Sequence, residues 1–274
     1  MSSFWLGPNA SARGYRVFGY DEIGSTSTEA AKAAEAGDVG EVWVAALKQT
    51  AGRGRRGRTW ETPSGNLAAS LLIVPDCDPS VAATLGFVAG VALNRALIAA
   101  LPAGTLKQGI DGADGPGHRV ALKWPNDLLA DGAKLAGILL EAHKGPNGQL
   151  AVVIGIGVNV QYAPAGLPYP ATSLKDLGIE ISAETIFAAL SDEWVAAYDT
   201  WANGRGVGDV LSLWRSFATG IGAEVAVKRE SDVVRGIFET IDDSGRLIVR
   251  ANDNSRIAIS AGDVHFGVTA SVRA

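Results

Sequence analysis

The chain has 274 residues, of which 47% are hydrophobic and 19% charged, and its formal net charge at pH 7 is −5. This length supports one large domain and a small one, and the acidic balance disfavours a dedicated nucleic-acid-binding protein, whose surface would be basic. The single cysteine, Cys77, excludes an intramolecular disulfide, and the three histidines lack zinc-ligand spacing. These features favour a reducing, cytoplasmic location.

The N-terminal segment has neither a basic stretch nor a continuous apolar run, so we expect no signal peptide. The most membrane-like segment, residues 81–101, contains Asn94 and Arg95, and a charge inside a membrane span is costly. We therefore expect a buried core helix at this position and no membrane segment.

Short apolar runs alternate with helix-length segments, which favours an α/β-type arrangement. A first helix is expected to begin near Thr26, where Thr26-Ser27-Thr28-Glu29 has the form of a capping box, and to end at Gly37. Residues 104–117 are rich in glycine and predict an exposed loop. Strands are expected at 42–47, 67–74, 120–124, 135–142 and 149–156, and helices at 183–201 and 207–219.

From residue 222 onward the composition changes to short alternating strands separated by turns. These strands are expected at 225–228, 236–241, 247–251 and 257–260. A segment of this length predicts a small β-barrel that covers one edge of a larger site. We therefore expect a catalytic domain at residues 1–220 and a C-terminal domain at residues 221–274.

Residues 52–58, Gly-Arg-Gly-Arg-Arg-Gly-Arg, place arginines among glycines that let the backbone wrap around a ligand. Guanidinium groups keep their charge and offer paired donors to phosphate or carboxylate oxygens. The segment therefore predicts an anion clamp, with a solvated basic loop or a nucleic-acid patch as the alternatives. It is not a Walker A loop, because no Gly-Lys-Ser/Thr follows the glycines.

The segment Lys123-Trp124-Pro125-Asn126-Asp127 follows an apolar strand, and strand ends are where ligands collect in α/β proteins. Pro125 interrupts a central strand, so Asn126 and Asp127 are expected to project from a turn. A proline turn capped by Asn or Asp is the structural alternative.

Three further features each have a binding and a structural interpretation. Lys134 opens an apolar strand, where it either reaches solvent or binds an anion. Gly155 and Gly157 interrupt a strand, which indicates close approach of a ligand or a packing bulge. Ser25 and Thr26 lie at a helix start, where they either cap the helix or meet an acceptor ligand.

Taken in order, these motifs closely resemble those of biotin–protein ligases. The resemblance is carried by Gly24-Ser25-Thr26, Gln49-Thr50-Ala51, residues 52–58, Trp60, Lys123-Trp124-Pro125-Asn126-Asp127, Lys134-Leu135-Ala136-Gly137 and Gly155-Ile156-Gly157-Val158-Asn159. It implies an α+β fold, a mixed sheet packed with helices as in class II aminoacyl-tRNA synthetases, with a small SH3-like C-terminal barrel. Ser27 departs from the pattern, because many relatives have asparagine there. Only a short segment precedes these motifs, so the helix-turn-helix domain of repressor members, and direct DNA binding, are not expected.

The resemblance implies an ATP-dependent, two-step ligase reaction. The biotin carboxylate attacks the α-phosphate of ATP to give biotinyl-5′-AMP, and a lysine of a biotin-carboxyl-carrier domain then attacks the mixed anhydride. Arg53, Arg55 and Lys134 would offset the repulsion between the two anions, and Asp127 would orient or help deprotonate the lysine. The resemblance assigns Ser25, Thr26, Gln49, Gly137 and Gly155 to biotin. It assigns Gly52, Arg53, Arg55, Arg58, Trp60, Lys123, Asn126, Lys134 and Asn159 to the nucleotide and phosphates.

Magnesium is expected with the triphosphate, without a named protein ligand. The Gly/Arg segment is also expected to close over the adenylate and to prevent its hydrolysis. Two rival functions are a lipoate–protein ligase or octanoyltransferase, and a non-catalytic regulator that binds nucleic acid through the basic loop. The possibility of a homodimer is left open.

Overall fold

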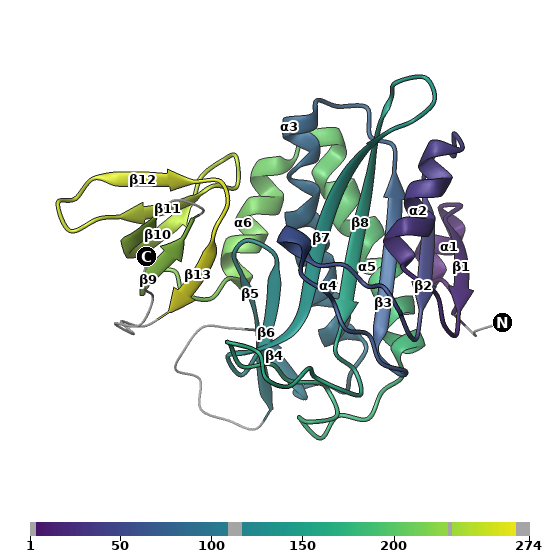
Figure 1. Cartoon of the computed structure of the whole chain (residues 1–274), viewed down its shortest axis with the longest axis horizontal. Coiled ribbons are helices and arrows are strands. Elements are labelled where there is room, and N and C mark those ends of the chain that lie inside the picture. Colours follow the sequence, from purple (N-terminus) through teal and green to yellow (C-terminus); the bar gives the residue numbers. More distant parts are fainter. Residues whose placement is uncertain (1–3, 109–116, 230–231, 267–274) are drawn as a thin grey trace.

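Strands from the first 158 residues pair into one large mixed sheet (Figure 1). In the computed structural model, which describes residues 4–108, 117–229 and 232–266, the strand order is β1-β2-β3-β8-β7-β6-β5-β4. The β1/β2 and β4/β5 pairs are parallel and the other neighbours are antiparallel. The strands are Arg16–Tyr20 (β1), Val42–Ala46 (β2), Leu67–Ile73 (β3), Leu106–Gln108 (β4), His118–Lys123 (β5), Asp127–Ala130 (β6), Ala133–Lys144 (β7) and Leu150–Val158 (β8).

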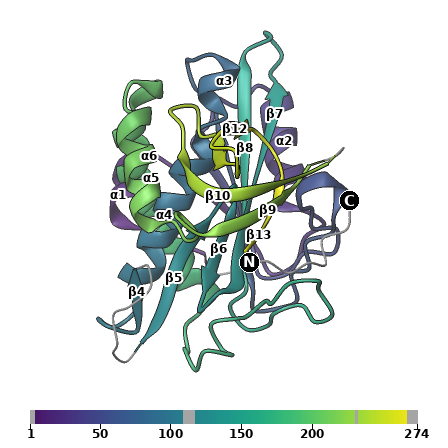
Figure 2. The same cartoon turned by 90° about the vertical axis from the view of Figure 1, so that its left-hand side faces the viewer.

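One face of this sheet packs against a group of apolar helices, whereas α2 covers part of the other face (Figure 2). The helices are Pro8–Ala12 (α1), Thr26–Glu35 (α2), Pro79–Ala82 (α3), Leu85–Ala99 (α4), Ala183–Trp201 (α5) and Val207–Phe217 (α6). The segment Pro79–Ala99 is long and apolar enough to cross a membrane by length and composition alone. Because 72% of its most apolar window is buried, it has the character of the expected core helix.

The predicted strands and helices are confirmed as strands and helices, but several begin or end at other residues than predicted. Ser25, not Thr26, is the N-cap of α2, and its side chain accepts a hydrogen bond from the backbone of Thr28. Glu29 therefore lies one position too far along for a capping box, and it pairs with Lys32 instead. The helix predicted at residues 81–101 is two helices, α3 and α4.

The loop predicted at residues 104–117 contains the short strand β4, and residues 109–116 lie outside the described residues. The turn predicted after Pro125 is shorter than expected, because Asp127 already pairs with Lys123 and Gly137 as the first residue of β6. The sequence reading also missed α1, β1, β6 and β13, which are short or partly exposed elements with weak apolar periodicity.

A second, antiparallel sheet with the order β12-β11-β10-β9-β13 follows α6 and fits the predicted SH3-like domain. Its strands are Glu224–Lys228 (β9), Val233–Ile241 (β10), Leu247–Arg250 (β11), Arg256–Ile259 (β12) and Asp263–Phe266 (β13). The buried indole of Trp124 donates a 2.9 Å hydrogen bond to the carbonyl of Gly245, which fastens this sheet to the end of β5. Trp124 thus connects the two sheets.

Backbone register places small residues in rows across the face of the large sheet that α2 partly covers, which we call the site face. One row of paired residues consists of Ala46, Ala68, Gly157, Gly137, Asp127 and Lys123. The neighbouring row consists of Val44, Ser70, Gly155 and Leu139. Paired residues point to the same face, so the first row forms a nearly bare floor that ends in a carboxylate and an ammonium group.

Candidate ligand-binding and catalytic site

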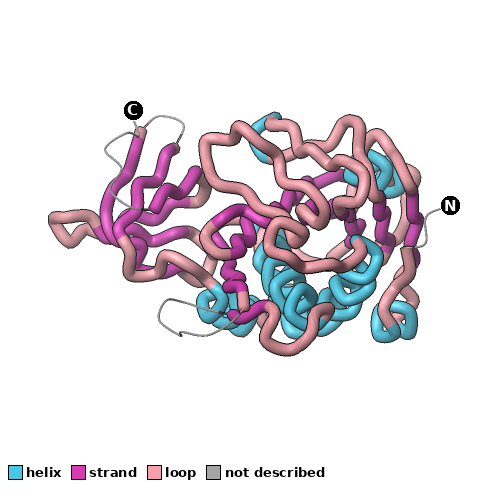
Figure 3. Tube along the Cα trace, turned by 90° about the horizontal axis from the view of Figure 1, so that it is seen from below, coloured by secondary structure: helices cyan, strands magenta, loops and turns pink. Residues whose placement is uncertain are grey.

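Long loops gather on the side of the large sheet opposite the main helix group (Figure 3). These loops and the start of α2 bring most of the predicted residues together over the site face. The site has two chemically different ends, a buried group of hydroxyls and an amide at α2 and a cluster of charged side chains near β6 and the Gly/Arg segment.

The uncharged end is built around Gln49, which follows β2 in the chain. Its Oε1 accepts hydrogen bonds from the backbone N–H of Thr26 at 2.8 Å and from the Thr26 hydroxyl at 3.1 Å. Its Nε2 donates to Thr62 Oγ1 at 3.1 Å. Ser25 faces its own helix and caps it, as its structural interpretation requires. Thr26 and Gln49 are therefore neighbours, as the biotin assignment requires.

Ser27 and Ser70, which the sequence reading did not assign to the site, complete this group. Ser70 Oγ lies 2.8 Å from Thr26 Oγ1 and 3.0 Å from Ser27 Oγ. Ser70 is fully buried in β3 opposite Gly155, a pairing that depends on sheet register. No local sequence pattern identifies such a residue.

The Trp60 side chain lies directly on the glycine floor. A Cβ on Gly157 would be 2.3 Å from the Trp60 indole nitrogen, and one on Gly137 would be 3.1 Å from the ring. A Cβ on Gly52 would be 2.2 Å from the carbonyl oxygen of Trp60, so glycine is also required where these two backbone segments pass. The side chain of Trp60 therefore occupies the space above Gly157 and Gly137, and the approach of a ligand to these glycines stays a prediction.

Lys134 and Asp127 form an ion pair at the charged end, with 2.7 Å between Nζ and Oδ1. Their side chains are 15% and 20% exposed, respectively. The rings of Trp60 and Tyr169 flank the ammonium group, each with its centroid 5.5 Å from Nζ. Asp127 Oδ1 is buried and receives no aligned hydrogen bond within the described part of the chain. This oxygen therefore retains the capacity to accept one.

Lys123 lies further along the same row, over the ring of Phe266 in β13 with 5.5 Å from Nζ to the centroid. Burial lowers the pKa of Lys123, and the charge of Asp127 acts in the opposite direction. The C-terminal sheet thereby covers one side of the charged end, which is the place predicted for the small domain.

Each arginine of the Gly/Arg segment already has a protein partner. Arg53 pairs with Glu141 of β7 at 3.0 Å, and Arg55 donates to Oδ1 of Asn126 at 2.8 Å. Arg56 and Arg58 both pair with Asp263 of β13, at 3.1 and 2.8 Å. These pairs attach the segment to both sheets, while the side chains of Arg53 and Arg58 remain 46% and 59% exposed, so the anion clamp stays a prediction beside the solvated basic loop.

Asp263 was not predicted, because it lies 205 residues from Arg58 in the chain. Burial by itself would raise the pKa of this carboxyl, but the hydrogen bond from Arg58 and the charges of Arg58, Arg56 and Arg55 hold it below its ordinary value. Burial also lowers the pKa of the Arg55 guanidinium, although an arginine stays charged at physiological pH.

Asn126 and Asn159, both predicted to bind the nucleotide, are engaged in the fold. The amide of Asn126 donates to the carbonyl of Ile138 at 2.6 Å and accepts from Arg55, which positions that guanidinium. Asn159 is 2% exposed and donates to the carbonyl of Thr172 at 3.1 Å, while its Oδ1 is buried and has no hydrogen-bond partner among the described residues.

Asn159 also lines a hollow of about 60 Å³ beside Trp60 and Lys134. The remaining lining residues are Thr59, Glu61, Pro164, Leu167, Tyr169 and Ala171. Tyr169 and its neighbours belong to a loop rich in proline and glycine that the sequence reading did not connect with the site. The unpartnered oxygen of Asn159 gives this hollow a buried acceptor.

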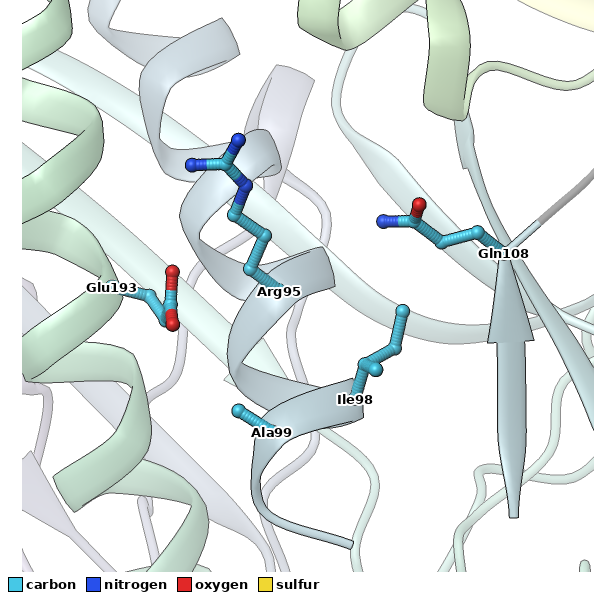
Figure 4. Close-up of a pocket in the computed structure, with 5 residues that line it drawn as sticks. All are labelled: Arg95, Ile98, Ala99, Gln108 and Glu193. Carbon is cyan, nitrogen blue, oxygen red and sulfur yellow. The ribbon is translucent and has the colours of Figure 1, made fainter. Parts of the chain in front are cut away.

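A larger hollow of about 480 Å³ lies elsewhere, among α4, α5 and β4 (Figure 4). Its lining includes Arg95 and Glu193, which project from two helices, and Gln108, which projects from the strand. It contains none of the predicted residues, and it lies on the helical side of the sheet. Size alone therefore does not identify the functional site.

A neutral hydrogen-bonded group, a glycine floor and a cation cluster along one face of the sheet match an elongated ligand with an anionic end. Such a site on a mixed α+β sheet is typical of a ligase that activates a carboxylic acid. Comparison with known proteins is consistent with this class. Residues 25–159 match the model of the biotin/lipoate A/B protein ligase family, and residues 220–267 match the biotin protein ligase C-terminal domain.

Three relatives illustrate the similarity. The biotin–[acetyl-CoA-carboxylase] ligase of Paracoccus denitrificans is 38% identical over 252 residues, which are 89% of this chain and 97% of the relative. The biotin protein ligase of Aquifex aeolicus, solved in complex with biotin and ATP, has the same fold, with a TM-score of 0.71 at 20% identity over 92% of this chain and 99% of the other. That of Leishmania major in complex with biotinyl-5-AMP has a TM-score of 0.59 at 26% identity over 90% and 99%. The chain belongs to the biotin/lipoate A/B protein ligase family, among the biotin–protein ligases.

Proposed function

We propose that the row from Thr26 and Gln49 to Lys134 and Asp127 is the site at which this ligase activates biotin with ATP and transfers it to a protein lysine. The observation that carries the proposal is the placement of a group of neutral polar side chains and a cation cluster at opposite ends of one glycine floor. Biotin has matching parts, a neutral ureido ring at one end and a carboxylate at the other.

At the uncharged end, biotin is bound by the residues around Gln49. Ser25, Thr26 and Gln49 surround the ureido ring, and Gly155 and Gly137 leave room for the bicyclic ring and the chain. Trp60 covers the ligand and moves from the floor when the site is filled, since its indole is within van der Waals distance of Gly157 and Gly137.

At the charged end, the biotin carboxylate meets the α-phosphate of ATP. Arg55 and Lys134 offset the repulsion between these anions and stabilise the charge that develops at the α-phosphorus. The other nucleotide and phosphate contacts are made by Gly52, Arg53, Arg58, Trp60, Lys123, Asn126 and Asn159. The carboxylate forms a bond to the α-phosphorus, and pyrophosphate leaves with the electron pair of the broken phosphoanhydride bond.

In the second step, a lysine amine attacks the carbonyl carbon of the mixed anhydride, and AMP is the leaving group. The amine must lose a proton, and Asp127 Oδ1 is a buried carboxylate oxygen with unused acceptor capacity. Asp127 therefore orients the incoming amine and helps to remove its proton. Lys134 Nζ, 2.7 Å from the same oxygen, holds this carboxylate in place beside the reacting groups.

Magnesium accompanies the triphosphate in this proposal. The described residues contain no group of three or more His, Cys, Asp or Glu side chains that could hold a metal ion. Mg²⁺ ordinarily keeps most of its ligands as water and phosphate oxygens, so the proposal names no protein ligand for it. The ion would supply charge neutralisation at the phosphates, while the chain supplies arginine and lysine.

The arginines of the Gly/Arg segment can exchange their carboxylate partners for phosphate groups, and this exchange gives the proposed closing motion a physical basis. Arg53 and Arg58 are held by side-chain carboxylates at positions that are 46% and 59% exposed. Exposed ion pairs of this kind contribute about 0–1 kcal/mol, so a phosphate group can replace the carboxylate at low cost. The segment closes over the adenylate in this way and protects it from water.

The remaining assignments concern the domains, the acceptor protein and the cellular location. Residues 1–220 form the catalytic domain, residues 221–274 form the C-terminal domain, and the acceptor is the biotin-carboxyl-carrier domain of a carboxylase. The single cysteine supports a cytoplasmic location, and the net negative charge supports the absence of direct DNA binding. Monomer and homodimer both remain open.

A transfer assay tests the proposal directly. The protein is incubated with ATP, a biotin-carboxyl-carrier domain and either labelled biotin or labelled lipoate, and covalent label is measured. We expect biotin to be attached and lipoate not to be, and Arg55→Ala to lose most of the activity. Transfer of lipoate alone, or no transfer of either label, would overturn the proposal.

A further inference from the structure

Asn66 lies in the turn before β3 and holds the start of the loop that carries Tyr169. Its Oδ1 accepts hydrogen bonds from three consecutive backbone N–H groups, those of Val160 at 3.0 Å, Gln161 at 2.9 Å and Tyr162 at 3.0 Å. Its Nδ2 donates to the carbonyl of Tyr162 at 2.8 Å. Only the oxygen of an amide can accept from these N–H groups, so the orientation of the side chain is fixed.

The side chain of Asn66 is buried beside the central strands of the large sheet, with 1% of the residue exposed. The next residue, Leu67, begins β3 and pairs with Val158 at the end of β8. Gly65 packs tightly against the same loop, because a Cβ there would lie 2.7 Å from Cγ of Gln161. Asn66 therefore anchors the loop to the middle of the sheet, at a place where bulk water does not replace its hydrogen bonds.

The loop that begins here, residues 161–173, is held from two sides at its base. The N–H of Lys175 donates to the carbonyl of Val160 over 3.0 Å, while the N–H of Val160 donates to Asn66. These two bonds fix the path of the chain from Asn159 into the loop.

The far part of this loop lies at the charged end of the site. The N–H of Lys134 donates to the carbonyl of Pro170 at 2.9 Å, and the ring centroid of Tyr169 lies 5.5 Å from Lys134 Nζ. Asn159, which precedes the loop, and Tyr169 both line the hollow beside Trp60. The position of these lining groups therefore depends on how the base of the loop is held.

We propose that Asn66 is a positioning residue for the nucleotide, which keeps the loop in the conformation that places Asn159 and Tyr169 around the hollow. The inference rests on the proposed binding of ATP at the charged end. Without the Asn66 amide, three buried N–H groups lose their acceptor, and the loop base adopts conformations in which water reaches them. Only the molecules that keep the original loop then bind ATP at full strength, so the apparent affinity falls with their fraction.

Asn66→Ala tests this role by a comparison of the two ends of the site. In biotin-dependent pyrophosphate exchange, we expect the KM for ATP to rise about tenfold or more, as it does when about one molecule in ten keeps the competent loop. Turnover at saturating ATP should fall by less than about threefold, since bound nucleotide selects that conformation. The dissociation constant of biotin, measured by calorimetry without ATP, should change by less than about twofold, because biotin binds both loop states equally.

Asn66→Asp keeps the oxygen that accepts the three N–H groups and loses only the donor to Tyr162. Its KM for ATP should therefore lie between that of the wild type and that of Asn66→Ala. A merely structural role would lower the melting temperature of both variants without this order of KM values. Asn252→Ala, at an exposed position between β11 and β12, is the matched control and should retain the wild-type constants.

Thermal melting establishes that each variant is folded. If Asn66→Ala is unstable, Asn66→Asp provides the test, with an expected KM for ATP at least about threefold above that of the wild type. An unchanged KM for ATP in the folded variant, or an equal loss of affinity for biotin and ATP, would overturn the inference while the wild type still exchanges pyrophosphate. Wild-type protein without biotin-dependent exchange would overturn the proposed function, and this inference with it.

Discussion

The two ends of the site differ in how their polar groups are held. At the uncharged end, Thr26, Ser27 and Ser70 are buried and hydrogen-bonded to one another in a fixed order. At the charged end, Arg53 and Arg58 have about half of their side-chain surface exposed and pair with carboxylates from distant segments. The first arrangement is preorganised for one ligand, whereas the second can exchange a protein carboxylate for a phosphate.

The largest effect is expected from Lys134→Ala, which removes a cation whose side chain is only 15% exposed. The turnover of adenylate formation should fall about 10²- to 10³-fold, because the lost charge acts on the transition state. The dissociation constant of biotin should change little, since its ring binds at the other end. Rapid-quench kinetics and calorimetry would measure the two quantities. Lys144→Ala, at an exposed position of the same strand, is the control.

Gly157→Ala should weaken the binding of biotin about tenfold or more, because the new methyl group occupies the floor on which Trp60 lies. Calorimetry with biotin checks this, and tryptophan fluorescence reports the displaced indole. The control is Gly208→Ala, where a Cβ has open space and the backbone has no left-handed conformation. Equal loss in both variants would indicate general destabilisation instead.

Ionic strength should affect ligand binding differently at the two ends of the site. Raising the ionic strength from 0.05 to 0.5 M, a range chosen to span roughly 14 to 4 Å of screening length, should raise the KM for ATP about three- to tenfold. The affinity for biotin, whose ring meets neutral groups, should change by less than about twofold. Steady-state kinetics and calorimetry over the same salt series provide the comparison, and parallel changes would contradict it.

The smallest effect is expected from Asp263→Asn, which releases Arg56 and Arg58 from β13. The KM for ATP should fall slightly, about two- to threefold, because phosphate no longer competes with the carboxylate. The lowered pKa of Asp263 means that its ion pairs stabilise the fold above the ordinary pKa of the carboxyl and are lost as the pH falls through the lowered value. The difference between the melting temperatures at acidic and at neutral pH should therefore be smaller in the variant than in the wild type.

Much of the fold and part of the site could be predicted from the sequence. Apolar periodicity located β3, β8 and α5. The glycines within strands were predicted to mark the approach of a ligand, whereas the side chain of Trp60 lies against Gly157. The interpretation of residues 52–58 as an anion clamp came from arginine chemistry. These signals are local, so a single segment contains them.

Other parts depend on contacts between distant segments. Ser70 meets Ser27 only because β3 and β8 pair in one register under α2, and Asp263 meets Arg58 only after the small sheet has packed on the large one. Asp127 begins a strand of four residues, which is too short to show a clear period. No local pattern reports such contacts.

Biotin-dependent exchange of labelled pyrophosphate into ATP tests the account most directly, because it measures both ends of the site in one reaction. We predict exchange only when biotin is present, a raised KM for biotin with little change in turnover in Ser27→Ala, and the reverse in Lys134→Ala. Exchange without biotin, or the same change of both constants in the two variants, would contradict the separation of the site into a biotin end and a phosphate end.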